Sequence, residues 1–325
     1  MKTRLFDSDT PVSEIALGCW QLGGDWGAMS DDEARTILRT AYENGVTFYD
    51  TANVYGGGVS EQRIGAWLRE DKPAGVFVAT KLGRTGPWAE TLTPQAIRTA
   101  TEQSLKNLGV DTLDLTQLHC IPTETLRIGE VFDTLQELKA EGKIRHFGAS
   151  VETVEEGQIC LTQPGLSSLQ VILNIFRQAP LATLLPAAQK MNVAILVRLP
   201  LASGLLSGKF TKDTTFAPQD HRTYNRDGAA FHVGETFGGL PFETGVELAD
   251  SLKPYVPEGL TMAQWAQRWC LDQPGVTALL TGATRPAQVR ENTAVSTLPP
   301  LSEDTLAELR QFYTDQVAPH IRGAM

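Results

Sequence analysis

Eight short apolar segments that alternate with helix-like segments constrain the fold of this chain more than any other feature. The intervening segments carry apolar residues at helical spacing, as at Ala34, Ile37, Leu38 and Ala41. Strands that alternate regularly with helices are typical of a parallel (β/α)8 TIM barrel. An open doubly wound sheet is the rival architecture, but no GxGxxG motif follows the first strand. The strands are expected at residues 15–18, 46–49, 75–80, 113–118, 142–150, 169–174, 193–198 and 276–281.

Three additions to the minimal barrel are expected, within one domain that covers residues 1–325. Residues 2–14 alternate weakly around a turn signal and predict a β-hairpin at the bottom of the barrel. Residues 203–242, after the seventh strand, form a long loop with little periodicity, and such loops are usually functional. Residues 301–317 predict an extra C-terminal helix. The barrel helices are expected to begin at Ser30 and Thr93 and to cover residues 60–70, 128–140, 152–161, 182–190, 261–273 and 286–294.

The composition is that of an ordinary globular protein and excludes several classes of function. The chain has 325 residues, of which 42% are hydrophobic, and a net charge of −10, which argues against a general nucleic-acid binder. No run of about 18 apolar residues is present, and the first residues lack the apolar core of a signal peptide. The four cysteines are scattered without a CxxC pair, which indicates reduced thiols. The sequence therefore predicts a cytoplasmic protein with no membrane or nucleic-acid partner.

Four polar side chains stand at or just after the ends of expected strands. Asp50 and Tyr55 follow the second strand, and Lys81 and His119 end the next two. These side chains should converge, because the C-terminal ends of all barrel strands open on one face. A hydride that arrives at a carbonyl carbon leaves negative charge on oxygen, which requires a proton donor and a preorganised hydrogen bond. Alternatively, Asp50 could cap a turn while Tyr55 packs, and a lysine such as Lys81 could form an imine.

These four positions resemble the catalytic tetrad of the aldo-keto reductases, and the resemblance extends over nearly the whole chain. It implies an NADP(H)-dependent enzyme that interconverts small aldehydes or ketones with alcohols. Tyr55 would then act as general acid and base, and Lys81 would lower its pKa. Asp50 would fix Lys81, and a neutral His119 would orient the substrate oxygen. The family resemblance also places Trp20, Tyr55, Trp88 and His119 around the substrate.

The same resemblance implies a set of cofactor-binding residues. Ser150 and Gln170 would hold the nicotinamide carboxamide, although Val151 stands where the family usually has asparagine. Arg285 and Gln288 would meet the 2′-phosphate at the start of a helix, where backbone N–H groups favour an anion; a solvated arginine is the alternative. Arg198 replaces the usual stacking aromatic residue. The full implied set is Trp20, Asp50, Ser150, Gln170, Arg198, Pro200, Leu201, Ser203, Gly204, Leu206, Lys209, Gly282, Thr284, Arg285, Gln288, Glu291 and Asn292.

Two other functions are compatible with the sequence. A Schiff-base lyase would use Lys81 as its nucleophile. A non-catalytic regulatory subunit would keep the fold and bind the cofactor as a sensor, as the potassium-channel β subunits do. No zinc-ligand spacing and no nucleophile elbow are found, so no metal site is expected. The physiological substrate and the oligomeric state do not follow from the sequence.

Overall fold

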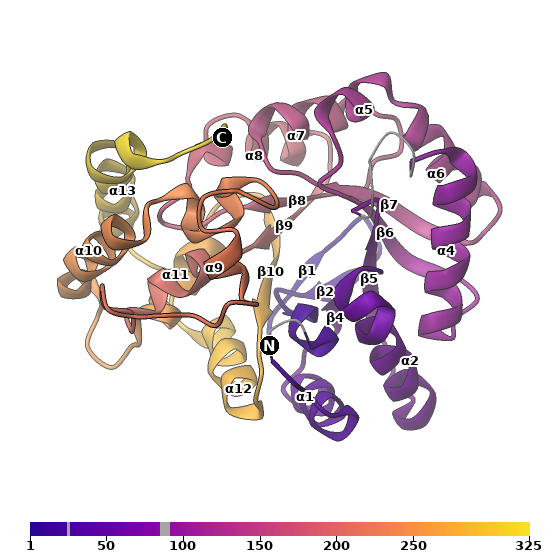
Figure 1. The fold of residues 1–325 in the computed structure, drawn as a ribbon, viewed down its shortest axis with the longest axis horizontal. Helices are drawn as coiled ribbons and strands as arrows, with labels where there is room; N and C mark the ends of the chain where they lie inside the picture. The colour runs from indigo at the N-terminus through magenta and orange to yellow at the C-terminus, as the bar shows by residue number, and fades with distance from the viewer. Residues whose placement is uncertain (25–26, 85–91) are drawn as a thin grey trace.

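A closed barrel of eight parallel strands forms the centre of the computed structural model, which describes residues 1–24, 27–84 and 92–325 (Figure 1). The strand order around the barrel follows the chain, and the eighth strand pairs with the first. The predicted (β/α)8 architecture is therefore confirmed. The strands are β3 (Ile15–Gly18), β4 (Phe48–Asp50), β5 (Phe77–Leu82), β6 (Leu113–His119), β7 (Ile144–Ser150), β8 (Ser168–Ile172), β9 (Ala194–Arg198) and β10 (Val276–Gly282).

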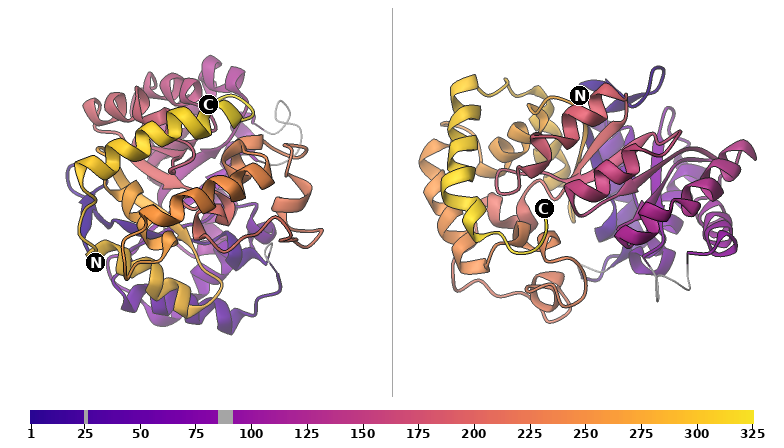
Figure 2. Two further views of the ribbon diagram at one scale, coloured as in Figure 1. Left: turned by 90° about the vertical axis from the view of Figure 1, so that its left-hand side faces the viewer. Right: turned by 90° about the horizontal axis from the view of Figure 1, so that it is seen from above.

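Helices surround the barrel, as the two further views show (Figure 2). Several begin where the sequence has a capping residue: the side chains of Ser30, Thr153 and Thr261 each accept a hydrogen bond from the third backbone N–H of their helix. The helix expected over residues 128–140 is found over residues 130–140, and Gly129, with a φ of 85°, separates it from a short helix that was not expected. The outer helices are α1 (Asp31–Glu43), α2 (Val59–Asp71), α4 (Pro94–Leu108), α5 (Thr123–Ile128), α6 (Glu130–Ala140), α7 (Val154–Leu161), α8 (Leu184–Lys190), α11 (Met262–Leu271) and α12 (Pro286–Ala294).

The apolar core has two parts. A small cluster fills the inside of the barrel and includes Phe48, Leu115 and Leu196. A larger cluster lies between the strands and the helices. This division explains why the strands read as nearly continuous apolar runs: both faces of each strand are buried. The described helices include none that is both long and apolar enough to cross a membrane.

The predicted hairpin closes the barrel at the N-terminal ends of its strands. Strands β1 (Thr3–Leu5) and β2 (Pro11–Ser13) pair antiparallel, and the ring of Phe6 lies 4.9 Å from that of Phe77 at the start of β5. Arg4 donates to the backbone carbonyls of Leu271 and Val276. The opposite, C-terminal face of the barrel is left for ligands.

The long segment after β9 covers part of that C-terminal face. It contains the short helix α9 (His221–Tyr224) and leads into α10 (Phe242–Leu252), a helix that the sequence analysis did not anticipate. The C-terminal helix α13 (Glu303–Phe312) lies on the outside, as predicted, and the tail beyond it returns to this segment (Figure 1). There Arg322 donates to the carbonyls of Gly239 and Leu240. These contacts fix the segment against the barrel.

Candidate active site

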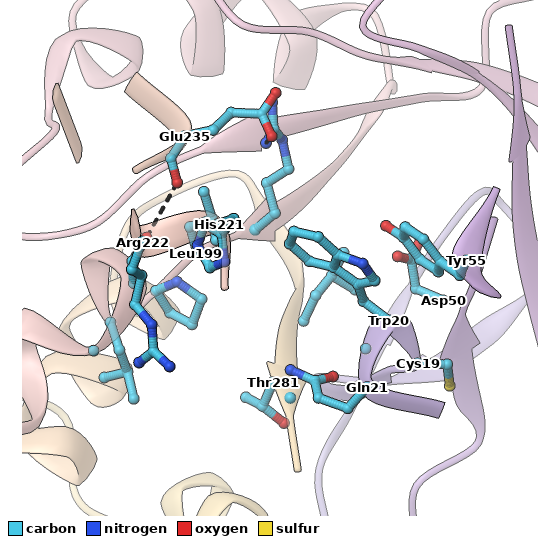
Figure 3. Close-up of a pocket in the computed structure, with 18 of the residues that line it drawn as sticks. Cys19, Trp20, Gln21, Asp50, Tyr55, Leu199, His221, Arg222, Glu235 and Thr281 are labelled. Atoms are coloured by element: carbon cyan, nitrogen blue, oxygen red, sulfur yellow. Dashed lines mark hydrogen bonds and ion pairs between the residues drawn. The ribbon is translucent and has the colours of Figure 1, made fainter. Parts of the chain in front are cut away.

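A cavity of about 970 Å³ opens at the C-terminal ends of the strands (Figure 3). Tyr55 and His119 line one end, and Gln288 and Asn292 at helix α12 line the other. The cavity therefore joins the candidate catalytic residues to the candidate adenosine site. Its elongated set of lining residues suits a dinucleotide together with a small molecule.

Lys81 is the centre of a buried polar network at the catalytic end. Its Nζ lies 2.5 Å from Asp50 Oδ1, 2.8 Å from the carbonyl oxygen of Thr51 and 3.4 Å from the hydroxyl of Tyr55. The second carboxylate oxygen of Asp50 accepts from Gln170 at 2.8 Å. Because the Lys81 side chain is only 1% exposed, its charge acts on Tyr55 with little screening by water.

The turn after β4 aims Tyr55 into this network. Gly56 has a φ of 59°, and a Cβ at this position would collide with the backbone of Gly23, so the tight turn requires glycine. Trp20 stacks on Tyr55 with 5.8 Å between the ring centres, and His119 meets Tyr55 edge-on at 5.9 Å. The three rings restrict the position of the phenol hydroxyl.

The protonation of the network follows from burial and neighbouring charge. Burial raises the pKa of Tyr55 above its usual value, and Lys81 opposes this only in part. Lys81 therefore lowers this pKa, as expected, but by less than burial raises it. Burial alone would lower the pKa of Lys81, but Asp50 and Tyr55 raise it above its usual value. Burial and the nearby Arg84 lower the pKa of His119 well below its usual value, which keeps the ring neutral as predicted.

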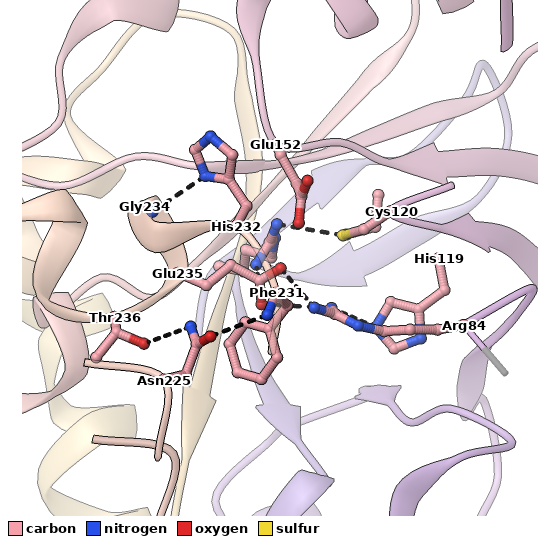
Figure 4. Close-up of polar contacts among 12 residues, drawn as sticks. Arg84, His119, Cys120, Glu152, Asn225, Phe231, His232, Gly234, Glu235 and Thr236 are labelled. Carbon is pink, nitrogen blue, oxygen red and sulfur yellow. Dashed lines mark hydrogen bonds and ion pairs between the residues drawn. The ribbon is translucent and has the colours of Figure 1, made fainter. Parts of the chain in front are cut away.

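A second charged group, which we call the guanidinium cluster, consists of Arg84, Arg198, Glu235 and Glu152. Figure 4 labels Arg84, Glu152 and Glu235. Glu235 accepts from Arg84 Nη2 at 2.8 Å and from Arg84 Nη1 at 3.3 Å, and it lies 3.2 Å from Arg198 Nη1. The cluster adjoins the catalytic end of the cavity, because Arg84 Nη1 lies 3.5 Å from Nε2 of His119. Arg198 is thus held by a carboxylate, which offsets the positive charge that it brings to the cofactor side.

The two carboxyl groups of the cluster differ in protonation. Burial alone would raise the pKa of Glu235, but Arg198 and Arg84 outweigh it and hold the pKa far below its usual value. Burial and the neighbouring Glu235 raise the pKa of Glu152 to about 8. Near pH 7 the cluster therefore contains one ionised carboxylate and one largely protonated carboxyl group.

Sequence reasoning missed most of this cluster. Arg84 follows the strand end at Lys81 by three residues, so its place at the C-terminal end of β5 was an available signal. Glu235 lies in the long segment after β9, where no periodicity marks any residue. Cys120, Glu152 and Glu235 could together offer ligands to a metal ion, with their ligand atoms within 4.8 Å of one another. However, the two arginines already neutralise Glu235, and burial raises the pKa of the Cys120 thiol to about 11.

Most of the residues implied for the cofactor lie along the cavity. Within the described parts of the chain, the lining residues among them are Trp20, Asp50, Ser150, Gln170, Arg198, Pro200, Leu201, Ser203, Gly204, Lys209, Gly282, Gln288 and Asn292. Four others lie outside this lining: Leu206 is buried in the core, Thr284 and Arg285 are exposed just before α12, and Glu291 is exposed within it. Trp88 lies outside the described residues.

The loop that follows β9 is shaped for close approach to a ligand. Leu199, Ala202 and Ser203 have φ angles between 47° and 56°, a region that residues other than glycine seldom adopt. Backbone strain of this kind persists where the surroundings fix it and is frequent at ligand sites. The hydroxyl of Ser203 donates to the carbonyl of Glu235 at 3.1 Å, which ties this loop to the guanidinium cluster.

The long segment also contributes to the cavity through α9. Arg222 is held 2.5 Å from Asp220 and lies over the ring of Phe216, 4.3 Å from its centre. His221 packs against Trp20 with 5.2 Å between ring centres. Arg222 and Tyr224 both line the cavity.

A cavity at the C-terminal ends of parallel barrel strands is typical of barrel enzymes, and comparisons with known proteins identify the family. A model of the aldo/keto reductase family matches residues 14–314. Aldo-keto reductase YhdN of Bacillus subtilis is 31% identical over 292 residues, covering 88% of this chain and 86% of its own. A glycerol dehydrogenase structure from Gluconobacter oxydans superposes with a TM-score of 0.78 at 33% identity, covering 99% and 97%.

A third relative was solved with a nicotinamide cofactor. The aldo-keto reductase of Klebsiella pneumoniae in complex with NADPH superposes with a TM-score of 0.72 at 25% identity, and 99% of each chain is covered. The chain therefore belongs to the aldo/keto reductase family. It is an NAD(P)H-dependent oxidoreductase of that family, as the sequence predicts.

Proposed function

We propose that the protein interconverts small aldehydes or ketones with alcohols, using NADP(H) and Tyr55 as general acid and base. The observation that supports this most directly is the Tyr55 hydroxyl, 3.4 Å from the buried ammonium of Lys81. When bound, the nicotinamide supplies a hydride to the carbonyl carbon in reduction and accepts one in oxidation. Two of the relatives described above support this proposal: one was solved with NADPH, and another is a glycerol dehydrogenase.

Tyr55 and Lys81 have different roles at the carbonyl oxygen: Tyr55 donates the proton, and Lys81 stabilises the phenolate that remains. In reduction Tyr55 donates its phenol proton to the oxygen, and the raised pKa keeps that proton in place beforehand. The phenolate that remains faces the Lys81 ammonium, whose own pKa is raised by Asp50. Lys81 therefore stabilises the negative charge that develops on Tyr55 during proton transfer. Stabilisation in the transition state, unlike stabilisation of the bound substrate, accelerates the reaction.

His119 positions the carbonyl oxygen without adding charge. A protonated imidazole near Lys81 and Arg84 would be repelled, and the low pKa of His119 avoids this. The neutral ring retains one N–H donor for the substrate oxygen. Trp20 packs on Tyr55 and lines the cavity, so it would limit the size of the group attached to the carbonyl.

The cofactor would extend along the cavity from Tyr55 to helix α12. Ser150 and Gln170 would meet the carboxamide, the strained loop at 199–204 would follow the pyrophosphate, and Asn292 would meet the adenine. Arg285 is the N-cap residue of α12, and its guanidinium is exposed, so it could meet a 2′-phosphate together with Gln288. Four unbridged buried cysteines support the expectation of a reducing, cytoplasmic environment.

Steady-state consumption of NADPH tests this proposal. We expect a panel of aldehydes and ketones to include compounds that the protein reduces over many turnovers, with alcohol formed in equal amount to NADPH consumed. One equivalent of NADPH oxidised without further turnover would instead favour the regulatory subunit. A covalent substrate adduct trapped by borohydride at Lys81, without any NADPH consumption, would favour the lyase.

A further inference from the structure

The guanidinium cluster gives the catalytic end of the cavity a local excess of positive charge. Two arginines, Arg84 and Arg198, face the single ionised carboxylate of Glu235, and the raised pKa of Glu152 keeps that group largely protonated near pH 7. The net charge of the four side chains of the cluster is therefore close to +1, although the net charge of the whole chain is −10. A positive site inside an acidic protein favours anionic ligands locally.

Arg84 is the member of the cluster nearest to the reacting oxygen. Its Nη1 lies 3.5 Å from Nε2 of His119, whose ring also meets Tyr55 edge-on. The ring of Phe231 lies 4.7 Å from the guanidinium carbon and holds its plane in one orientation. An acidic group within a few bonds of the carbonyl carbon would therefore come within reach of Arg84.

The geometry of the cluster already suits a carboxylate. Arg84 binds Glu235 through both terminal nitrogens, which is the paired geometry that a guanidinium forms with a planar carboxylate. An arginine has five N–H donors, so Arg84 retains capacity for a second acceptor. Arg198 Nε is buried and lacks a hydrogen-bond partner among the described residues, so the cluster contains more donors than its own acceptors satisfy.

We propose that Arg84 selects carbonyl substrates that carry a carboxylate close to the reacting carbon, such as 2-oxo acids, short semialdehydes or the matching hydroxy acids. This inference rests on the proposed carbonyl reduction. Glu235 holds Arg84 in place for this role and limits the strength of binding, since it competes for the same donors. The reaction itself is unchanged: the carboxylate is recognised and does not react.

Kinetics with an acid and its methyl ester isolate the charge of the substrate. We would compare glyoxylate and 4-oxobutanoate with their methyl esters as substrates, using NADPH at saturation. Wild-type kcat/KM should favour each acid over its ester by at least about 10-fold, the scale of one charge-assisted hydrogen bond. Arg84→Gln should lower this acid-to-ester ratio by about 10- to 100-fold. Glu235→Gln should raise it, because the competing carboxylate is removed.

A surface arginine provides the matched control. Arg127 pairs with Glu124 and Glu155 on exposed helix faces, so Arg127→Gln should leave the acid-to-ester ratio unchanged. A wild-type ratio near one, or equal losses for acid and ester in Arg84→Gln, would overturn the anion proposal while leaving carbonyl reduction intact.

Binding of a non-reacting anion decides the proposal without catalysis. We expect oxalate monomethyl ester, which keeps one carboxylate, to bind the protein with NADP⁺ at least about 10-fold more tightly than the uncharged dimethyl ester. Tryptophan fluorescence would report the binding, and Arg84→Gln should remove the difference. If no carbonyl is reduced at all, the proposed function fails by itself, whereas equal binding of the two esters would overturn the anion proposal specifically.

Discussion

The two charged groups at the catalytic end of the cavity differ in how their charges are matched. Lys81 and Asp50 form a one-to-one ion pair at adjacent strand ends, with Asp50 further held by Gln170. In the guanidinium cluster one carboxylate, Glu235, pairs with two arginines: Arg84, which follows β5, and Arg198, the last residue of β9. The first arrangement is suited to fixing a proton donor, and the second retains donors that a ligand could use.

The difference also concerns the framework that supports each group. The Lys81 network stands on barrel strands, which hold side chains more precisely than loops do. Arg84 and Glu235 are 151 residues apart in the sequence and meet only because the long segment folds back over the barrel mouth. The contacts of Arg322 with Gly239 and Leu240 hold that segment down. Changes to the first group should affect the chemistry, whereas changes to the second should affect which substrate is accepted.

The largest expected effect comes from the phenol hydroxyl of the first group. Tyr55→Phe removes the proton donor and keeps the ring that packs on Trp20. We expect kcat for carbonyl reduction to fall by about 10²–10⁴-fold, the usual scale for general acid catalysis. The affinity for NADPH, measured by fluorescence quenching, should hardly change. Retention of wild-type turnover would remove Tyr55 from the mechanism.

Lys81→Met should reduce activity and also destabilise the fold. It leaves the buried Asp50 carboxylate without its counter-ion, which typically costs about 3–5 kcal/mol in the free energy of unfolding. The double variant with Asp50→Asn should recover much of the stability in urea unfolding but none of the activity. Equal stability of Lys81→Met and wild type would show that the pair is not buried as described.

Arg285 tests the opposite end of the cavity. We expect wild type to bind NADPH about 10- to 150-fold more tightly than NADH, as one or two charge-assisted phosphate contacts allow. Arg285→Ala should weaken NADPH binding by most of that factor and leave NADH binding nearly unchanged. The exposed Arg290, further along the same helix, supplies the matched control. Equal losses for the two cofactors would place Arg285 away from the 2′-phosphate.

Glu152 should give the smallest effect, on the pH dependence of stability. Its pKa is raised from 4.5 to about 8 in the fold, so the folded state holds the proton more tightly than the unfolded state. The contribution of Glu152 to the free energy of unfolding is fully present below about pH 4.5 and is lost as the pH rises through about 8. We expect Glu152→Gln to be more stable than wild type near pH 9, on the order of 1–3 kcal/mol.

Urea unfolding near pH 5 and pH 9 measures this change. The gain should be much smaller at pH 5, where wild-type Glu152 is already protonated. The exposed Glu124 supplies a control, since Glu124→Gln should show no comparable pH dependence. A Glu152→Gln variant with the same pH dependence as wild type would mean that Glu152 is ionised in the fold at neutral pH.

The sequence predicted the barrel and the Lys81 network because both depend on short-range patterns. Short apolar runs located the β-strands, and Asp50, Lys81 and His119 stand at or next to the ends of three consecutive strands. The net pKa direction of Tyr55 could not be predicted, since it depends on how deeply the packed structure buries the phenol. The residue types identified Lys81 as the charged neighbour that lowers the pKa of Tyr55. They did not reveal the larger effect of burial, which raises this pKa.

The guanidinium cluster could not be predicted because its pairing depends on the path of an irregular segment. Neither the segment 203–242 nor helix α10 after it follows a barrel repeat, so nothing in the sequence places Glu235 against Arg84. Arg198 was noted only as a departure from the stacking aromatic residue. Its ion pair with Glu235 changes that interpretation, since the charge is shared with a carboxylate.

Transfer of a labelled hydride tests the central claim most directly. The protein would be given NADPH that carries deuterium at both C4 positions, together with an aldehyde that it consumes, and the product would be analysed by mass spectrometry. We expect an alcohol with one deuterium on the former carbonyl carbon, formed much more slowly by Tyr55→Phe with the same label. An unlabelled product, or loss of the carbonyl compound without any alcohol, would contradict it.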